Sequence, residues 1–187
     1  MNNPLRALVV HESMFGNTAQ VAAAVARGLE LEDVETTLVE VWAAPVHLPP
    51  DLDLLVVGGP THAFSLSRAS TRADAVRQGS KAEHTDVGVR EWLDFVTIDA
   101  DHAPVVATFD TRVAKVRWLP KAAGPTAAHL ARRRGLSSIG KPVGFLVEDI
   151  RGPLVDGETQ RAVEWGRRLG TELVDRAAAR IATRGGG

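Results

Sequence analysis

Short apolar runs bounded by polar or glycine-rich residues constrain the fold of this chain more than any other feature. Four of them are predominantly apolar, at residues 7–10, 54–57, 104–109 and 142–147. Runs of this length without polar alternation are typical of strands that are buried on both faces, as in parallel sheets. A fifth run, residues 34–41, is half polar and rich in β-branched residues, which is typical of an edge strand.

Segments with helical spacing separate these runs. Apolar residues recur at three- and four-residue intervals after residue 19 and over residues 89–96. We also expect a short helix opened by Thr71 and Asp74, a helix within residues 120–134, and a last helix capped by Asp156. Strands that alternate with helices predict a three-layer α/β fold with a parallel sheet. A chain of 187 residues is long enough for one domain with a good core, so residues 1–187 are predicted to form a single domain.

The first strand runs into a polar loop, residues 13–18, and then into a helix. The free N–H groups and the positive dipole at a helix start can bind an anion, and Gly16 lets the backbone approach it. The loop has no Lys or Arg, and the chain has neither the G-x-x-x-x-G-K-[ST] nor the G-x-G-x-x-G pattern of nucleotide sites. Ser13, Asn17 and Thr18 therefore either bind a phosphate or only cap the helix.

Ser-x-x-Gly-Asn-Thr after a buried strand resembles the FMN-phosphate loop of the flavodoxin family. The resemblance implies a doubly wound, five-stranded parallel sheet in the order 2-1-3-4-5, with non-covalently bound FMN at its carboxyl edge. It assigns the phosphate to Ser13, Met14, Phe15, Gly16, Asn17 and Thr18. It assigns the flavin ring to two further loops, formed by Pro60, Thr61, His62, Ala63 and Phe64 and by Thr108, Phe109, Asp110, Thr111 and Arg112.

The residue that would stack on the ring stays open. Flavodoxins often use a tyrosine, and this chain has none. The alternatives are His62, Phe64, Phe109 and Trp118. Of these, Phe109 is better explained as a core residue at the end of a strand, whereas the position of His62 at the loop apex favours contact with the ring.

Composition excludes several other classes. The chain has no cysteine and its six histidines show no metal-binding spacing, so neither thiolate chemistry nor a metal site is predicted. The net charge of −1 does not indicate a nucleic-acid or membrane partner. The first strand starts within a few residues of the N-terminus without a signal-peptide pattern, so we expect a cytoplasmic protein. Asp51 and Asp53 precede their strand, which argues against a response-regulator phosphorylation site.

Two functional classes follow from the resemblance. The first is an electron carrier that serves a redox partner protein. The second is an NAD(P)H-dependent reductase of a quinone or another small-molecule electron acceptor. A third, non-redox use of the fold remains. The segment 65–89 is longer than a direct strand-to-helix connection, as lids and partner sites often are.

Charge near the predicted ring suggests what such a site would serve. Cations exceed anions in both of the stretches 60–79 and 107–121. This excess predicts an anionic substrate or partner, and a hydroquinone couple less negative than that of flavodoxins with acidic surroundings.

Overall fold

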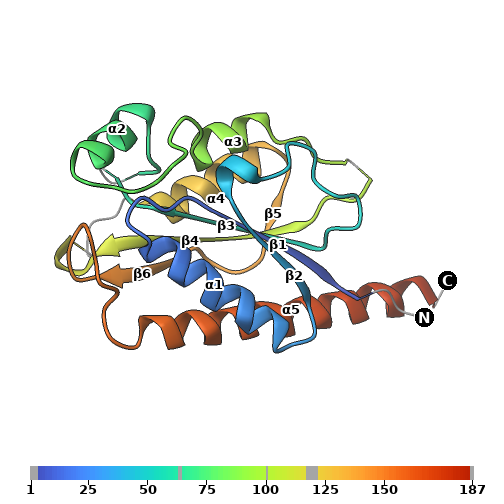
Figure 1. The fold of residues 1–187 in the computed structure, drawn as a ribbon. Helices are drawn as coiled ribbons and strands as arrows, with labels where there is room; N and C mark the ends of the chain where they lie inside the picture. Colours follow the sequence, from blue (N-terminus) through green and yellow to red (C-terminus); the bar gives the residue numbers. More distant parts are fainter. Residues whose placement is uncertain (1–3, 63–64, 100, 117–121, 186–187) are drawn as a thin grey trace.

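The computed structural model describes residues 4–62, 65–99, 101–116 and 122–185, without the side chains of Ile181 and of residues 183–185 (Figure 1). Strands and helices alternate along most of this length. The strands are β1 (Arg6–His11), β2 (Glu35–Glu40), β3 (Leu54–Pro60), β4 (Val105–Val113), β5 (Ser137–Ser138) and β6 (Val143–Val147). The helices are α1 (Asn17–Glu30), α2 (Ala69–Arg77), α3 (Val89–Phe95), α4 (Ala123–Arg133) and α5 (Glu158–Gly185), with 3₁₀ turns η1 (Val41–Ala43) and η2 (Ala114–Val116).

The strands form one parallel sheet in the order β2-β1-β3-β4-β5, with β6 also paired to β4. The predicted order is therefore confirmed. The fifth position is divided between two strands, because β5 pairs with the first two residues of β4 and β6 with the last five.

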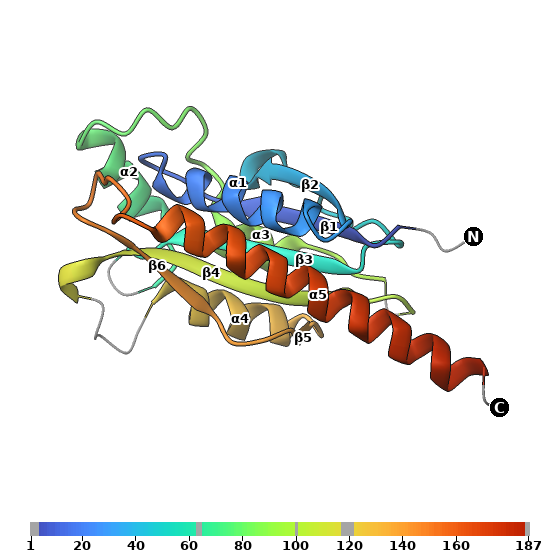
Figure 2. The same ribbon diagram turned by 90° about the horizontal axis from the view of Figure 1, so that it is seen from below.

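Helices cover both faces of the sheet, so the three-layer prediction is also confirmed (Figure 2). Alternate residues of β1 enter two separate cores. Ala7 and Val9 belong to the core with α1 and α5, whereas Leu8 and Val10 belong to the core with α3 and α4. This burial on both sides is why residues 7–10 of β1 and 54–57 of β3 are all apolar.

Glycines let α1 and α5 approach each other closely. A Cβ atom on Gly28 would lie 2.2 Å from the carbonyl oxygen of Val163, and one on Gly166 would lie 2.2 Å from that of Val25. The contact holds the start of α5 against α1, while the C-terminal part of α5 extends beyond the sheet (Figure 2).

Two predicted helix starts are wrong. The second helix begins at Ala69 rather than Thr71, whose hydroxyl instead accepts a hydrogen bond from the backbone N–H of Arg68 at 2.9 Å. The last helix begins at Glu158, and Asp156 accepts no hydrogen bond from its first turn; the N–H of Glu158 bonds to the carbonyl of Val155 instead.

Residues 66–88, which carry α2, are fixed to the core by a buried arginine. The guanidinium of Arg72, only 1% exposed, donates to the carbonyl oxygens of Thr85 and Asp86 at 2.7 and 3.2 Å. It also donates to the hydroxyl of Ser67 at 2.9 Å and pairs with Glu91 at 3.2 Å. The long connection between β3 and α3 is therefore anchored at both its ends and its middle.

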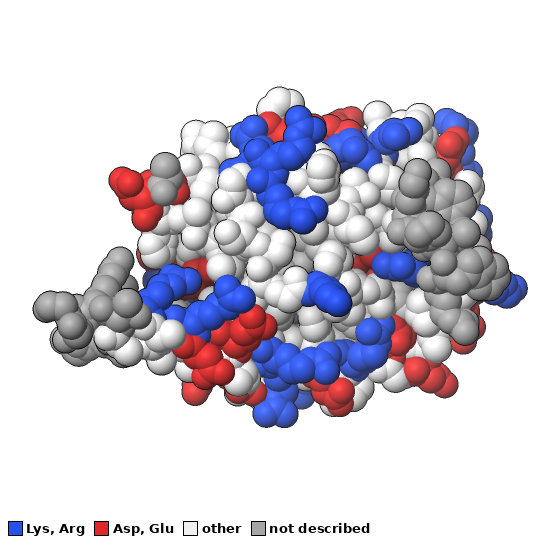
Figure 3. Space-filling view, turned by 180° about the vertical axis from the view of Figure 1, so that it is seen from behind, with Lys and Arg blue, Asp and Glu red and all other residues white. Residues whose placement is uncertain are grey.

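Charged side chains of both signs are interspersed on the face opposite to that of Figure 1 (Figure 3). In the part of the chain that the structure describes, no helix combines the length and the apolar character needed to cross a bilayer.

Candidate functional site

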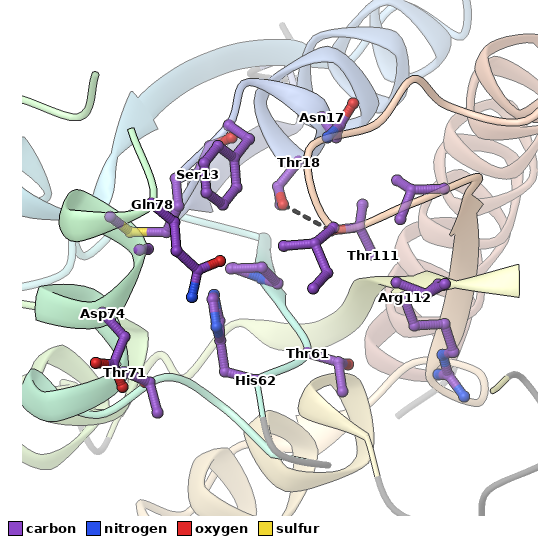
Figure 4. Close-up of a pocket in the computed structure, with 17 residues that line it drawn as sticks. Ser13, Asn17, Thr18, Thr61, His62, Thr71, Asp74, Gln78, Thr111 and Arg112 are labelled. Atoms are coloured by element: carbon purple, nitrogen blue, oxygen red, sulfur yellow. Dashed lines mark hydrogen bonds between the residues drawn. The ribbon is translucent and has the colours of Figure 1, made fainter. Parts of the chain in front are cut away.

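A cavity of about 260 Å³ lies at the carboxyl ends of β3, β4 and β6, beside the start of α1 (Figure 4). This edge is where ligands bind in open parallel α/β sheets. Its lining comes from segments far apart in the sequence: Ser13, Met14, Phe15, Asn17, Thr18, Pro60, Thr61, His62, Thr71, Asp74, Ala75, Gln78, Thr111, Arg112, Val113, Val147 and Ile150. The first and second predicted loops both contribute to it.

The start of α1 has the geometry expected of an anion site. Gly16 precedes the helix with φ +86°, and a Cβ atom built on it would meet no atom within 4 Å. The hydroxyl of Ser13 accepts a hydrogen bond from the N–H of Ala19 at 3.2 Å. Within the described residues, the N–H groups of Asn17 and Thr18 have no protein acceptor. Two donors at the positive end of the helix dipole are thus left for a ligand.

Thr18 also contributes through its side chain. Its hydroxyl lies 2.8 Å from that of Thr111, and both residues line the cavity (Figure 4). Within such a pair one hydroxyl donates to the other, and the accepting hydroxyl keeps its own proton. The pair therefore connects α1 to β4 and retains one donor for a ligand.

The predicted third loop is wrong, because Thr108 to Arg112 are strand residues of β4. Thr108 is buried and donates to the carbonyl of Gly124 at 3.0 Å. Phe109 is fully buried in the core, with its ring 5.9 Å from that of Phe145. Neither residue lines the cavity, which leaves Thr111 and Arg112 from this stretch.

Asp110 is a buried anchor and does not line the cavity. Its carboxylate accepts two hydrogen bonds from Arg112, both at 2.6 Å. It also accepts one from the N–H of Gly124 at 3.0 Å and one from the hydroxyl of Thr61 at 3.2 Å. The guanidinium of Arg112 points away from His62 (Figure 4). Asp110 therefore joins β4, the end of β3 and the start of α4.

The loop after β3 presents His62 to the cavity. Its backbone is tight, with hydrogen bonds from the N–H of His62 to the carbonyl of Ser65 at 2.9 Å and in the reverse sense at 3.0 Å. The Nε2 atom of His62 is buried and has no hydrogen-bond partner among the residues that the structure describes. Burial, assisted by the charge of Arg72, lowers the pKa of His62, so the ring is neutral at pH 7. Ala63 and Phe64, which were assigned to the same loop, lie outside the described residues.

The described residues narrow the choice of ring neighbour. Phe109 is in the core, as its position at a strand end suggested, and His62 lines the cavity. Phe64 and Trp118 lie outside the described residues. Phe15 also lines the cavity, as an aromatic residue that sequence analysis considered only for the phosphate loop.

Comparisons with known proteins bear on the fold. No protein-family model matches the chain, and neither does any curated protein sequence. A flavodoxin from the domain Archaea matches with a TM-score of 0.59 at 14% identity, covering 90% of this chain and 99% of that one. Flavodoxin 1 from Bacillus cereus matches with a TM-score of 0.61 at 14% identity, covering 91% and 97%.

A larger protein also matches. The rubredoxin oxygen:oxidoreductase from Desulfovibrio gigas has a TM-score of 0.61 at 13% identity, covering 92% of this chain but only 37% of that one. The chain has a flavodoxin-like fold. At these identities the likeness extends to the fold alone, so the function has to be argued from the site itself.

In this flavodoxin-like fold, α2 forms a cavity wall that sequence analysis missed. The wall residues are Thr71, Asp74, Ala75 and Gln78 (Figure 4). Their spacing of i, i+3, i+4 and i+7 puts them on one face of a helix, and this was the signal that the sequence offered. Val113, Val147 and Ile150, from the opposite side of the cavity, were also missed and carry no motif.

Within the described part of the chain, the expected excess of positive charge around the cavity is reduced only by the pair of Arg72 with Glu91, because Asp74 and Asp110 belong to the two stretches in which cations exceed anions. Three of the cations form ion pairs: Arg72 with Glu91 at 3.2 Å, Arg77 with Asp74, and Arg112 with Asp110 at 2.6 Å. Arg117 and Lys121 lie outside the described residues. Among the residues that the structure describes, no group of three or more His, Cys, Asp or Glu side chains could hold a metal ion. Arg68 and Lys115 form no ion pair with another described residue.

Proposed function

We propose that this protein binds FMN without a covalent bond and carries electrons through it. The observation that carries the proposal is the start of α1, where Gly16 in the left-handed conformation precedes the unbonded N–H groups of Asn17 and Thr18. A site that offers backbone donors and hydroxyls without a cation suits a phosphate monoester held by hydrogen bonds and the helix dipole.

The remaining lining fits the other parts of the cofactor. The Thr18–Thr111 pair offers a donor next to the proposed phosphate site, and the loop from Pro60 to His62 would lie against the ring. His62 supports this placement, because a buried Nε2 atom without a partner is costly unless a ligand bonds to it. Bound FMN would supply one- and two-electron chemistry, while these residues bind it and orient it.

The α2 wall favours a second candidate, an NAD(P)H-dependent reductase of a quinone or another small molecule. A carrier needs an exposed ring edge for its partner protein, whereas a reductase needs a pocket over the ring. Thr71, Asp74, Ala75 and Gln78 enclose one side of the cavity and would form such a pocket. A net anionic electron acceptor would suit the unpaired cations Arg68 and Lys115 near this edge of the sheet.

Flavin titration tests the proposal directly. The purified protein should be yellow or should become so with FMN, at one flavin per chain, and should bind FMN more tightly than riboflavin. Oxidation of NADH or NADPH by the loaded protein, with and without a quinone, then separates the reductase from the carrier. A protein that shows neither a flavin spectrum nor thermal stabilisation by FMN would have a non-redox role.

A further inference from the structure

The loop between β6 and α5 lies against the proposed phosphate site. Ile150 of this loop lines the cavity. Two residues later, Gly152 packs on the first residue of α1: a Cβ atom on Gly152 would lie 2.4 Å from Oδ1 of Asn17. Gly152 has φ +96°, a conformation that favours glycine and lets the loop pass this close to Asn17. Arg151 therefore stands between the cavity wall and the helix start.

The side chain of Arg151 reaches the opposite wall. Its Nη2 atom donates a hydrogen bond to the carbonyl oxygen of Gln78, the residue that ends α2. A cation at a helix C-terminus interacts favourably with the last carbonyls. The hydroxyl of Ser80 donates to the carbonyl of Met14 at 2.6 Å, so the end of α2 is tied to the phosphate loop as well. Arg151 and Ser80 together connect α2, the phosphate loop and the loop before α5.

Arg151 also supplies a charge that residues 13–18 lack. Among the described residues it forms no ion pair, although Glu148 and Asp149 are in the same loop. Its partner is a neutral carbonyl, which can be exchanged for a stronger, charge-assisted bond to a phosphate oxygen. Arg72, Arg77 and Arg112, in contrast, are each held by a carboxylate.

We propose that Arg151 is a phosphate-retaining residue: its side chain connects Gln78 to the loop that packs on the start of α1, and it slows the dissociation of the cofactor by holding its phosphate group. This inference rests on the proposed binding of FMN. It adds a cationic contribution to a site that the sequence motif describes as uncharged, and it comes from a loop more than 130 residues after that motif.

The test compares Arg151→Met with Arg151→Lys and with Arg180→Met, a control that removes an exposed arginine from the far end of α5. Release of FMN and of riboflavin is followed by the recovery of flavin fluorescence on dilution, at low and at high salt. Arg151→Met should release FMN about tenfold faster, since an exposed charge-assisted bond contributes at the lower end of its usual range. Arg151→Lys should be intermediate, and Arg180→Met unchanged. The effect on FMN should shrink at high salt, and riboflavin release should change little.

Inorganic phosphate provides a readout without flavin. It should raise the melting temperature of the apo forms of the wild type and Arg180→Met more than that of Arg151→Met. Equal acceleration of FMN and riboflavin release, or equal stabilisation of all variants by phosphate, would overturn the role of Arg151 while leaving FMN binding intact. A wild type that phosphate stabilises through Arg151 but that binds no FMN would instead contradict the proposed function.

Discussion

Replacement of Gly16 by alanine separates phosphate binding from helix capping. Gly16 and Gly135 have nearly the same left-handed backbone, with φ +86° and +89°, and at both a Cβ atom would meet nothing within 4 Å. Alanine in this conformation costs about 1–2 kcal/mol at either position. Gly16→Ala and Gly135→Ala should therefore lower the free energy of unfolding by similar amounts, as measured by urea denaturation of the apo protein.

Only Gly16→Ala should impair FMN binding. Its methyl group would extend into open space beside the start of α1, where the phosphate is proposed to lie against the N–H groups of Asn17 and Thr18. Each charge-assisted bond to a phosphate contributes about 1.5–3 kcal/mol. Loss of both would weaken FMN by about 3–6 kcal/mol, or two to four powers of ten in the dissociation constant.

Fluorescence titration with FMN and riboflavin measures this difference. Riboflavin lacks the phosphate, so its affinity should be nearly the same in Gly16→Ala, Gly135→Ala and the wild type. If Gly16→Ala binds FMN as tightly as Gly135→Ala does, the loop before α1 is only structural and the phosphate assignment is wrong.

Three further measurements probe other parts of the cavity. Thr18→Val and Thr111→Val should each weaken FMN binding. Because the two hydroxyls bond to each other, the double variant should lose less binding free energy than the sum of the two single losses. Additive losses would contradict a shared donor. Burial and the charge of Arg72 lower the pKa of His62, so on acidification the unfolded state binds a proton at this residue before the folded state does. The free energy of unfolding of the apo protein should therefore fall as the pH drops below about 6.5, and His62→Gln should make this fall smaller. The same pH profile of unfolding in the wild type and the variant would refute this role of His62. A unit charge at roughly 10 Å from the flavin ring changes the energy of the anionic hydroquinone by about 0.6 kcal/mol after salt screening. Arg68 and Lys115 together should therefore raise the potential of the hydroquinone couple by on the order of 50 mV relative to the Arg68→Gln/Lys115→Gln variant. A redox titration that finds no difference would show that both charges are too far from the ring.

The features that sequence analysis predicted correctly depend on neighbouring residues. The apolar run of β1 is local, and so is the change from Ser13 to the helical spacing after Asn17. Strands buried on both faces are apolar whatever the rest of the chain does, so the layers could be inferred from the apolar runs. The strand order, in contrast, followed only from the resemblance to the flavodoxin family. The loop before α1 could also be inferred, because Gly16 and the helix start are adjacent in the sequence. Its role in binding a phosphate stays a prediction.

The errors arise where distant residues change the character of a segment. Thr108 to Arg112 were expected to form a loop because the resemblance to flavodoxins places the second flavin-ring loop there, although the apolar run 104–109 predicted a strand as far as Phe109. The structure neutralises Asp110 with Arg112 and adds donors from Thr61 and Gly124, residues 49 and 14 positions away. With its carboxylate satisfied, the segment continues as β4 and pairs with β6. Arg112 is a local partner of Asp110, but the contributions of Thr61 and Gly124 cannot be read from the neighbouring sequence.

The role of residues 65–89 depends on Arg72 in the same way. Sequence analysis left this segment as a lid or a partner site because of its length. Its arginine is instead buried, paired with Glu91 and bonded to the carbonyls of Thr85 and Asp86. Detachment of α2 would break the ion pair and these hydrogen bonds together, and each such hydrogen bond contributes about 0.5–1.5 kcal/mol to stability. The α2 wall is therefore a fixed part of the cavity rather than a gate. The shape of the cavity that Gln78, His62 and Thr71 define would therefore set the access to a bound flavin. The size of the electron acceptor is then the property that distinguishes a reductase from a carrier.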